Sequence, residues 1–389
     1  MKSPTDKVEE NLIRRKDLMV SDNLRRQVPE GSKKKDTLET FDGAFNVQDM
    51  EQYVKKLGII EWLGGSEEER TKDRNLAALQ RLLIRPRALV RPVGNRDLTT
   101  VLLNGKITVT MPICFSPSAF QMYAHADGET ATAKGCGKAG ALMTLSAWSN
   151  KPLEQVKKES GCENMWMNVY IFKHRDRITQ LVRRAENAGY NAIVVSVDIP
   201  ILSRRKGSSF YKEVGKFIEA AHFPASDPQF KDLLAGDPDA TWNDFAEICK
   251  MTTLPVIAKG IMSAEDAREA LKHGASAIFV SNHGGRQLDG APSTIEVLAE
   301  VVREVNGSCD VYVDGGFRSG MDVFKGLALG AKAVFLGRPA FYGLAYNGSD
   351  GVQKVLEIMS EQLSRTMALS GCAKLSDITP DRVMTAAFL

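Results

Sequence analysis

The 389-residue chain lacks the cysteine patterns of a metal site or a disulfide framework. Its six cysteines form no CxxC pair and stand at no zinc-ligand spacing from a histidine. We therefore expect no bound metal, and thiols that are reduced and mostly buried. Acidic and basic residues nearly balance, with a net charge of +3, and no basic stripe or RNA-binding motif is present. A nucleic-acid partner is not expected.

Long apolar runs are also absent. No stretch reaches the roughly eighteen consecutive apolar residues of a membrane span, and the first residues are rich in Lys and Glu without the apolar region of a signal peptide. We therefore expect a soluble protein that does not bind a membrane. The chain ends in Ala-Ala-Phe-Leu and not in a Ser-Lys-Leu-type peroxisomal signal, so a cytoplasmic location is the default expectation.

The chain changes character near residue 45. Residues 1–44 are polar, with clusters of Lys and Arg among acids, and such a composition cannot offset its ordering entropy by burial. We predict a flexible tail there and one domain over residues 45–389. Two helical patterns open this domain. Their apolar positions are Met50, Tyr53, Val54 and Leu57 in the first, and Leu76, Leu79, Leu82 and Leu83 in the second.

Eight short apolar runs follow, at residues 112–115, 141–145, 166–171, 192–197, 254–258, 277–280, 311–313 and 333–336. Amphipathic helical patterns lie between them, for example at 177–188, 264–273 and 319–329. This alternation predicts an α/β fold of the (β/α)8 TIM-barrel type. An open, doubly wound sheet is the alternative, but no GxGxxG motif follows an early strand.

Polar residues and glycines follow each apolar run, at the end where a barrel has its active site. The loop after residues 277–280 reads Ser-Asn-His-Gly-Gly-Arg-Gln. His283 can accept a proton near neutral pH, and Arg286 can bind a carboxylate through two parallel hydrogen bonds. The pair predicts proton abstraction from an acid substrate. A loop whose His and Arg contact only the backbone is the alternative that the pair alone leaves open.

The loops after the last two runs contain glycines and arginines, at residues 314–318 and 337–338. Barrels commonly bind phosphate there, because glycines let backbone N–H groups approach an anion and arginines neutralise it. A phosphorylated ligand is therefore predicted. Glycines are also ordinary turn residues, which is the alternative for either loop taken alone.

Three motifs give the chain a family resemblance: Ser-Asn-His-Gly-Gly-Arg-Gln-Leu-Asp at 281–289, Asp-Gly-Gly-Phe-Arg at 314–318 and Leu-Gly-Arg-Pro at 336–339. They resemble the FMN-dependent 2-hydroxy acid oxidases and dehydrogenases, typified by glycolate oxidase. Residues 85–87, 117–119, 145–148 and 366–372 are similar to the family in order and spacing, and the resemblance extends over about residues 74–367.

The resemblance implies roles for individual residues at the substrate. His283 corresponds to the general base, Asp198 to the carboxylate that stabilises its protonated form, Arg286 to the carboxylate clamp, Tyr170 to a hydrogen-bonding partner of the substrate hydroxyl, and Lys259 to the cation beside flavin N1. Arg205 is implied as a second cation near the substrate, and Trp148 as a further contact of the substrate.

The resemblance also implies FMN as the cofactor. Its expected contacts on the N5 side are Pro117, Ser118 and Ala119, and those with the ring or ribityl chain are Ser146, Asn168, Ser196 and Ser281. The ribityl and phosphate end would meet Asp314, Gly315, Gly316, Phe317, Arg318, Gly337 and Arg338. A homo-oligomer, by resemblance a tetramer, and a peroxisomal location are further implications of the family.

Two positions depart from the family pattern. A tyrosine that binds the substrate carboxylate is missing, and Glu61 or Trp62 stands near its place. Asn168 replaces a glutamine that contacts the flavin, with the same kind of hydrogen-bonding groups. Residues 206–251 are polar and long enough for a mobile lid.

We therefore expect FMN-dependent oxidation of a 2-hydroxy acid to a 2-oxo acid, with electrons passing to O2 to give H2O2 or to an external acceptor. Two alternatives stay open. One is isomerase-like FMN chemistry without net oxidation, and the other, suggested by the missing tyrosine, is non-catalytic FMN binding.

Overall fold

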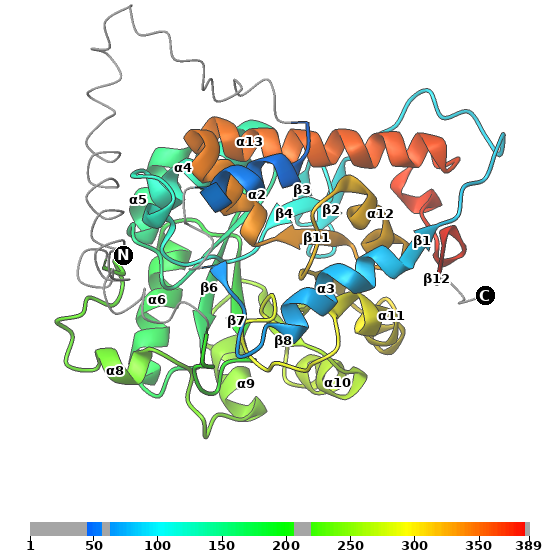
Figure 1. The fold of residues 1–389 in the computed structure, drawn as a ribbon. Helices are drawn as coiled ribbons and strands as arrows, with labels where there is room; N and C mark the ends of the chain where they lie inside the picture. Colours follow the sequence, from blue (N-terminus) through cyan, green and yellow to red (C-terminus); the bar gives the residue numbers. More distant parts are fainter. Residues whose placement is uncertain (1–44, 57–62, 206–218, 386–389) are drawn as a thin grey trace, which may run out of the picture. The chain divides into compact units, whose positions relative to one another are not determined.

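The computed structural model describes residues 45–56, 63–205 and 219–385 (Figure 1). The predicted tail at 1–44, part of the predicted lid at 206–218, and Glu61 and Trp62 lie outside the described residues. None of the helices within these ranges is long and apolar enough to cross a membrane.

Eight parallel strands close into a barrel in the order β10-β11-β4-β5-β6-β7-β8-β9. They are β4 (Ile113–Phe115), β5 (Met143–Leu145), β6 (Met165–Tyr170), β7 (Ala192–Ser196), β8 (Val256–Ile261), β9 (Ala277–Val280), β10 (Asp310–Val313) and β11 (Ala333–Leu336). Each predicted apolar run contributes one strand, so the TIM barrel is confirmed. Strand β11 pairs with both β10 and β4, so the ring of strands is closed and has no edge strand. The open, doubly wound sheet is therefore excluded.

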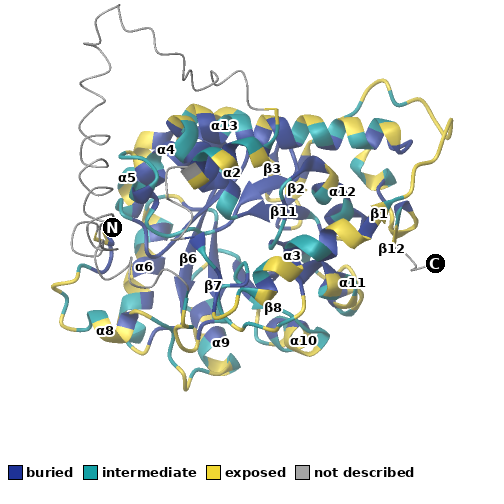
Figure 2. Cartoon of the chain, in the orientation of Figure 1, coloured by how far each residue is buried: buried dark blue, intermediate teal, exposed yellow. Residues whose placement is uncertain are grey.

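The barrel strands are mostly apolar because both of their faces are covered, by the barrel interior and by the outer helices. All six residues of β6 and all five of β7 are buried, and the strands are dark blue in Figure 2. The helices around the barrel are α4 (Gly128–Ala139), α5 (Leu153–Ser160), α6 (Arg175–Asn187), α9 (Trp242–Lys250), α10 (Ala264–Lys272), α11 (Thr294–Val305), α12 (Gly320–Ala328) and α13 (Arg338–Leu369). The helices predicted at 177–188, 264–273 and 319–329 correspond to α6, α10 and α12.

Within the described part of the chain ahead of the barrel lie the helices α2 (Val47–Lys56) and α3 (Arg70–Arg81). The predicted second helix was wrong at its end, because Leu82 and Leu83 belong to strand β1 (Leu82–Ile84). This strand pairs antiparallel with β12 (Val383–Thr385). Leu82 is buried and Leu83 is exposed, which is strand alternation, and Pro86 disfavours a helical conformation at the residue before it.

One end of the barrel is closed by an aromatic core and a hairpin. Trp166 and Phe335 stack with centroids 5.4 Å apart, and the hydroxyl of Tyr312 accepts a hydrogen bond from the Leu103 amide at 3.0 Å. Leu103 lies between β2 (Thr100–Leu102) and β3 (Ile107–Val109), which pack against this core. The hairpin covers the end where the strands begin, since the Asn104 amide donates to Asp310, the first residue of β10. The carboxyl ends of the strands are left for the site.

Candidate active site

A cavity of about 740 Å³ lies at the carboxyl ends of the barrel strands. Most of the predicted site residues line it: Pro117, Ser118, Ala119, Ser146, Trp148, Tyr170, Arg205, Lys259, His283, Arg286, Asp314, Gly315, Gly316, Arg318, Gly337 and Arg338. The remaining ones do not line it and are Asn168, Ser196, Asp198, Ser281 and Phe317. Of these five, Asn168 and Ser196 bond to each other, Asp198 contacts His283, Ser281 contacts Lys259, and Phe317 is buried with its carbonyl accepting from Arg318.

His283 and Asp198 form a part-buried pair, with side chains 17% and 13% exposed, although 85 residues separate them in the sequence. The His283 Nδ1 atom lies 3.2 Å from both carboxylate oxygens of Asp198. His283 has a φ of 57° and is followed by two glycines that are also at positive φ, so the loop after β9 turns sharply at the histidine. Because Nδ1–H donates to the carboxylate, Nε2 is left with the lone pair that accepts a proton.

The surroundings of this pair favour a neutral imidazole beside a charged carboxylate. Burial lowers the pKa of His283 from its usual 6.5, against the opposing charge of Asp198, and the nearby Lys259 lowers it further. Burial alone would raise the pKa of Asp198, but its interaction with His283, together with the charge of Lys259, outweighs burial and lowers the pKa from its usual 3.8. The histidine is therefore free of a proton at neutral pH, as a general base must be.

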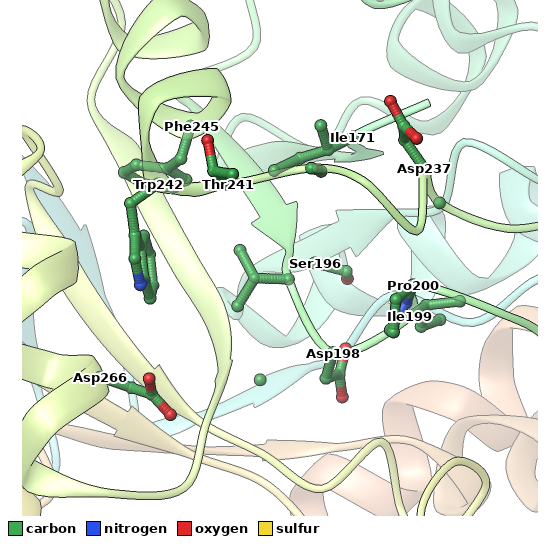
Figure 3. A pocket seen from close by; sticks show the side chains of 14 residues that line it. Ile171, Ser196, Asp198, Ile199, Pro200, Asp237, Thr241, Trp242, Phe245 and Asp266 are labelled. Atoms are coloured by element: carbon green, nitrogen blue, oxygen red, sulfur yellow. The ribbon is translucent and has the colours of Figure 1, made fainter. Parts of the chain in front are cut away.

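Asp198 also lines a second cavity, of about 370 Å³, which Figure 3 shows between the end of β7 and the start of α9. Thr241, Trp242 and Asp266 lie around it. Gly260 packs against Asp198, and a β-carbon there would lie 2.6 Å from the Asp198 β-carbon. Residue 260 must therefore be glycine for Asp198 to keep this position.

A buried network surrounds Lys259, near the end of β8. Its ammonium donates to the Ser281 hydroxyl at 2.6 Å and forms an ion pair with Asp314 at 3.1 Å. Ser281 and Ser116 both donate to the Asp314 carboxylate, at 2.6 and 2.8 Å. A fixed cation therefore lies at the cavity wall, held by a carboxylate with several partners.

The phosphate loops predicted from sequence place two arginines at the cavity. Arg338 donates from Nε to the Leu63 carbonyl at 2.7 Å and from Nη1 to the Gly284 carbonyl at 3.0 Å. Its Nη2 atom is buried without a hydrogen-bond partner among the described residues. Burial, together with the like charge of Arg286, lowers the pKa of Arg338 to about 10. An anion bound here would accept a hydrogen bond from the Nη2 atom and would offset the unfavourable burial of the two like charges.

The glycines of the same loops complete an anion-binding cradle with Arg318 and Arg338. Gly315 and Gly316 have φ values of 99° and 94°, and a β-carbon on Gly316 would lie 2.5 Å from the Asn75 carbonyl of α3. Gly337 precedes the first turn of α13, and a β-carbon there would meet open space. The positive end of a helix thus faces the same region as the two arginines.

Asn168, on β6, has a polar atom without a partner. Its amide nitrogen donates to the Val194 carbonyl and the Ser196 hydroxyl, at 3.0 and 3.1 Å. The Oδ1 atom is buried and accepts no hydrogen bond from the described residues. A ligand with an N–H group near this strand would satisfy it.

Sequence reasoning missed two residues that support the site. Asn75 on α3 and Asn282 exchange two side-chain hydrogen bonds, at 2.9 and 2.8 Å, which fix the loop that contains His283. Ser116 is the second hydroxyl on Asp314. Nothing in the sequence indicated a role for Asn75, because a polar residue on an amphipathic helix is ordinary. Ser116 lies in a polar loop after a strand, and only its hydrogen bond to Asp314 distinguishes it from its neighbours.

Together, the barrel, the neutral base and the clustered arginines define a TIM-barrel enzyme for an anionic substrate and a phosphate-bearing ligand. The family model for FMN-dependent dehydrogenases matches residues 59–385. The chain is 42% identical over 353 residues to 2-hydroxyacid oxidase 1 of Homo sapiens, covering 85% of this chain and 94% of that protein. It is likewise 42% identical over 344 residues to glycolate oxidase of Spinacia oleracea, covering 85% and 92%.

A solved structure of mandelate oxidase with 3,3-difluoro-2-hydroxy-3-phenylpropionic acid superimposes with a TM-score of 0.80 at 36% identity, covering 89% of this chain and all of that one. The chain therefore belongs to the FMN-dependent 2-hydroxy acid oxidase and dehydrogenase family. It is an FMN-dependent oxidoreductase. The residues present fit this cofactor, since the arginine and glycine cradle suits its phosphate and the Asn168 Oδ1 atom suits an N–H of its ring system.

Proposed function

We propose that the protein oxidises the C2 hydroxyl of a 2-hydroxy acid to a 2-oxo acid, and that electrons leave to O2, giving H2O2, or to an external acceptor. The observation that supports this most directly is the neutral His283 beside Asp198, on the same loop as Arg286. The names of the relatives, 2-hydroxyacid oxidase, glycolate oxidase and mandelate oxidase, agree with it. Neither isomerase-like chemistry nor non-catalytic binding is favoured by these comparisons.

In this proposal, His283 removes a proton from the substrate, either from the hydroxyl or from C2. Asp198 lies against Nδ1 and stabilises the imidazolium that results. Bound FMN would supply the acceptor for the two electrons and the second hydrogen that the substrate loses. The substrate is thereby converted from an alcohol to a ketone without loss of carbon.

Arg286 and Arg205 are proposed to hold the substrate carboxylate. The Arg205 Nε atom donates to the Arg286 carbonyl at 3.1 Å, so the two arginines are fixed relative to each other. Burial, and then the charge of Asp198, raises the pKa of Tyr170 to about 12. Its hydroxyl therefore keeps its proton and can donate a hydrogen bond to the substrate oxygen at C2.

Lys259 is proposed to stabilise negative charge on the cofactor, because it is a buried cation at the cavity wall. Asp314 and Ser281 position it. Arg318, Arg338 and the glycines of their loops are proposed to hold the phosphate.

The first test is the absorption spectrum of the purified protein before and after anaerobic addition of 2-hydroxy acids, from glycolate to aromatic ones. Bleaching of a flavin band by any of them supports the proposed oxidation. A flavin band that no hydroxy acid bleaches contradicts it.

The acid limb of the pH profile should report His283. Because its folded-state pKa lies below 6.5 and the neutral form is the base, kcat/KM should be constant above neutrality and fall on acidification with a midpoint below 6.5. Asp198 raises this pKa, so the Asp198→Asn variant should have a lower plateau and a midpoint shifted to still lower pH. The profile is measured as initial rate against pH at constant ionic strength. A midpoint above 6.5, or an upward shift in the variant, would show that another group is the base.

Arg338→Met should weaken FMN binding by about 10- to 100-fold, the effect of one hydrogen bond to a charged group. Fluorescence titration of apoprotein with FMN measures the affinity, and Arg338→Lys should recover part of it by restoring charge without the planar donor set. Arg303→Met, on the exposed face of α11, is the control that should bind as the parent does. Parental affinity in Arg338→Met would refute the phosphate role.

We also propose a homo-oligomer, a cytoplasmic location, and a flexible polar tail at residues 1–44 ahead of the barrel domain. All six cysteines lie within the described residues and are unpaired, which agrees with a reducing compartment. Light scattering of the full chain and of residues 45–389 would give the oligomeric state of each and show whether the tail contributes to it.

A further inference from the structure

The outer part of the active-site cavity has a wall of aromatic side chains that none of the proposed chemical steps uses. Phe172 follows β6, and Phe223 and Phe230 belong to the stretch between β7 and α9; all three line the cavity. The rings of Phe172 and Phe223 lie edge to face with centroids 5.2 Å apart. Trp148 joins them, at 5.0 Å from Phe223 and 6.1 Å from Phe230.

This wall begins beside the catalytic groups. Tyr170 ends β6 and Phe172 follows it by two residues, and the centroids of their rings are 5.6 Å apart. A substrate whose C2 oxygen meets Tyr170 therefore has the aromatic side chains within reach of its C2 substituent. The arginines proposed to bind the carboxylate come from other loops, after β7 and β9. The carboxylate and the substituent thus have separate binding regions.

Among the described residues, none fills the space along this wall. Leu202 and Leu234 also line the cavity, and they are 47% and 38% exposed, while Phe230 is only half-buried. Side chains in a packed core leave few voids, and exposed apolar surface that lines a cavity is typical of a ligand site. The side chains that form this wall are aromatic or aliphatic, so none of them carries a charge that could pair with a second anionic group.

We propose that the preferred substrate is a 2-hydroxy acid with a bulky, uncharged, apolar substituent on C2, an aryl group or an alkyl chain of about six carbons, and that Phe172, Phe223 and Phe230 determine this specificity. This inference rests on the proposed function. Each buried methylene should raise kcat/KM by up to about fourfold, which corresponds to about 0.8 kcal/mol per methylene.

The experiment compares kcat/KM for glycolate, 2-hydroxybutanoate, 2-hydroxyoctanoate, mandelate and the dicarboxylate malate with the holoenzyme. We expect 2-hydroxyoctanoate or mandelate to exceed glycolate by at least about 100-fold, the product of several such methylene increments, and malate to be poor. A maximum at glycolate or malate would overturn the inference and leave the oxidation itself established. No reduction of the flavin by any of the five would instead contradict the proposed function.

Two variants test the residues. Phe230→Ala should lower kcat/KM for 2-hydroxyoctanoate and mandelate by about 10-fold or more, as expected when a contact of about three methylene equivalents is lost, and should leave glycolate nearly unchanged. Phe223→Ala should do the same more strongly if it folds, because Phe223 is 2% exposed and Phe230 is half-buried. Phe45→Ala, at a position that is 78% exposed outside the cavity, is the matched control. An equal loss for all substrates in Phe230→Ala would refute a specificity role.

Discussion

His283→Gln should lower kcat by about 100- to 10,000-fold, the range that general base catalysis contributes. The amide of glutamine approximates the shape and polarity of the imidazole but cannot accept a proton near neutral pH. Asp198 would also lose the partner that outweighs the cost of its burial, so its pKa should rise. Single-turnover reduction of the flavin, followed by stopped-flow absorbance, measures the chemical step directly.

The chain contains a matched control for this variant. His174 lies 3.1 Å from Asp232 in a second His–Asp pair, but this pair is on the surface, with side chains 26% and 52% exposed. His174→Gln should leave the reduction rate unchanged. A His283→Gln enzyme that keeps its FMN and reduces it within about 10-fold of the parental rate would fall below the range expected for a base and exclude that role.

The barrel was predictable because its strands have a simple physical signature. A strand that is covered on both faces must be apolar without alternation, and each of the eight runs that met this condition contains a strand. The position of the cavity followed from the same pattern, since the carboxyl ends of parallel strands meet on one face. Strand β1 was missed because a run of Leu-Leu-Ile after a helix fits either helical or strand periodicity.

The contacts within the site were less predictable, because they join residues far apart in the chain. No spacing in the sequence links Asp198 to His283 or Asn75 to Asn282, which are 85 and 207 residues apart. The first pair was expected only through the family resemblance, and the second was not expected. Phe223 and Phe230 were not predicted as site residues, because they belong to a stretch that is polar on average. The average polarity of a stretch does not indicate which few of its side chains line a cavity.

Arg286→Met should lower kcat/KM for a 2-hydroxy acid by about 100-fold or more, because a bidentate contact provides two hydrogen bonds to a charged group at about 1.5–3 kcal/mol each. Arg286 also donates from Nη1 to the Gly64 carbonyl at 2.8 Å, so a loss of activity alone would not separate substrate binding from loop anchoring. The primary amide of the same hydroxy acid resolves this, because it lacks the carboxylate charge. If Arg286 binds the carboxylate, the parent enzyme should prefer the acid to the amide strongly, and Arg286→Met should lose most of that preference. Arg286→Lys should retain part of it through charge alone. An unchanged ratio of acid to amide in Arg286→Met would assign the arginine to the anchoring of Gly64 and leave Arg205 as the residue that binds the carboxylate.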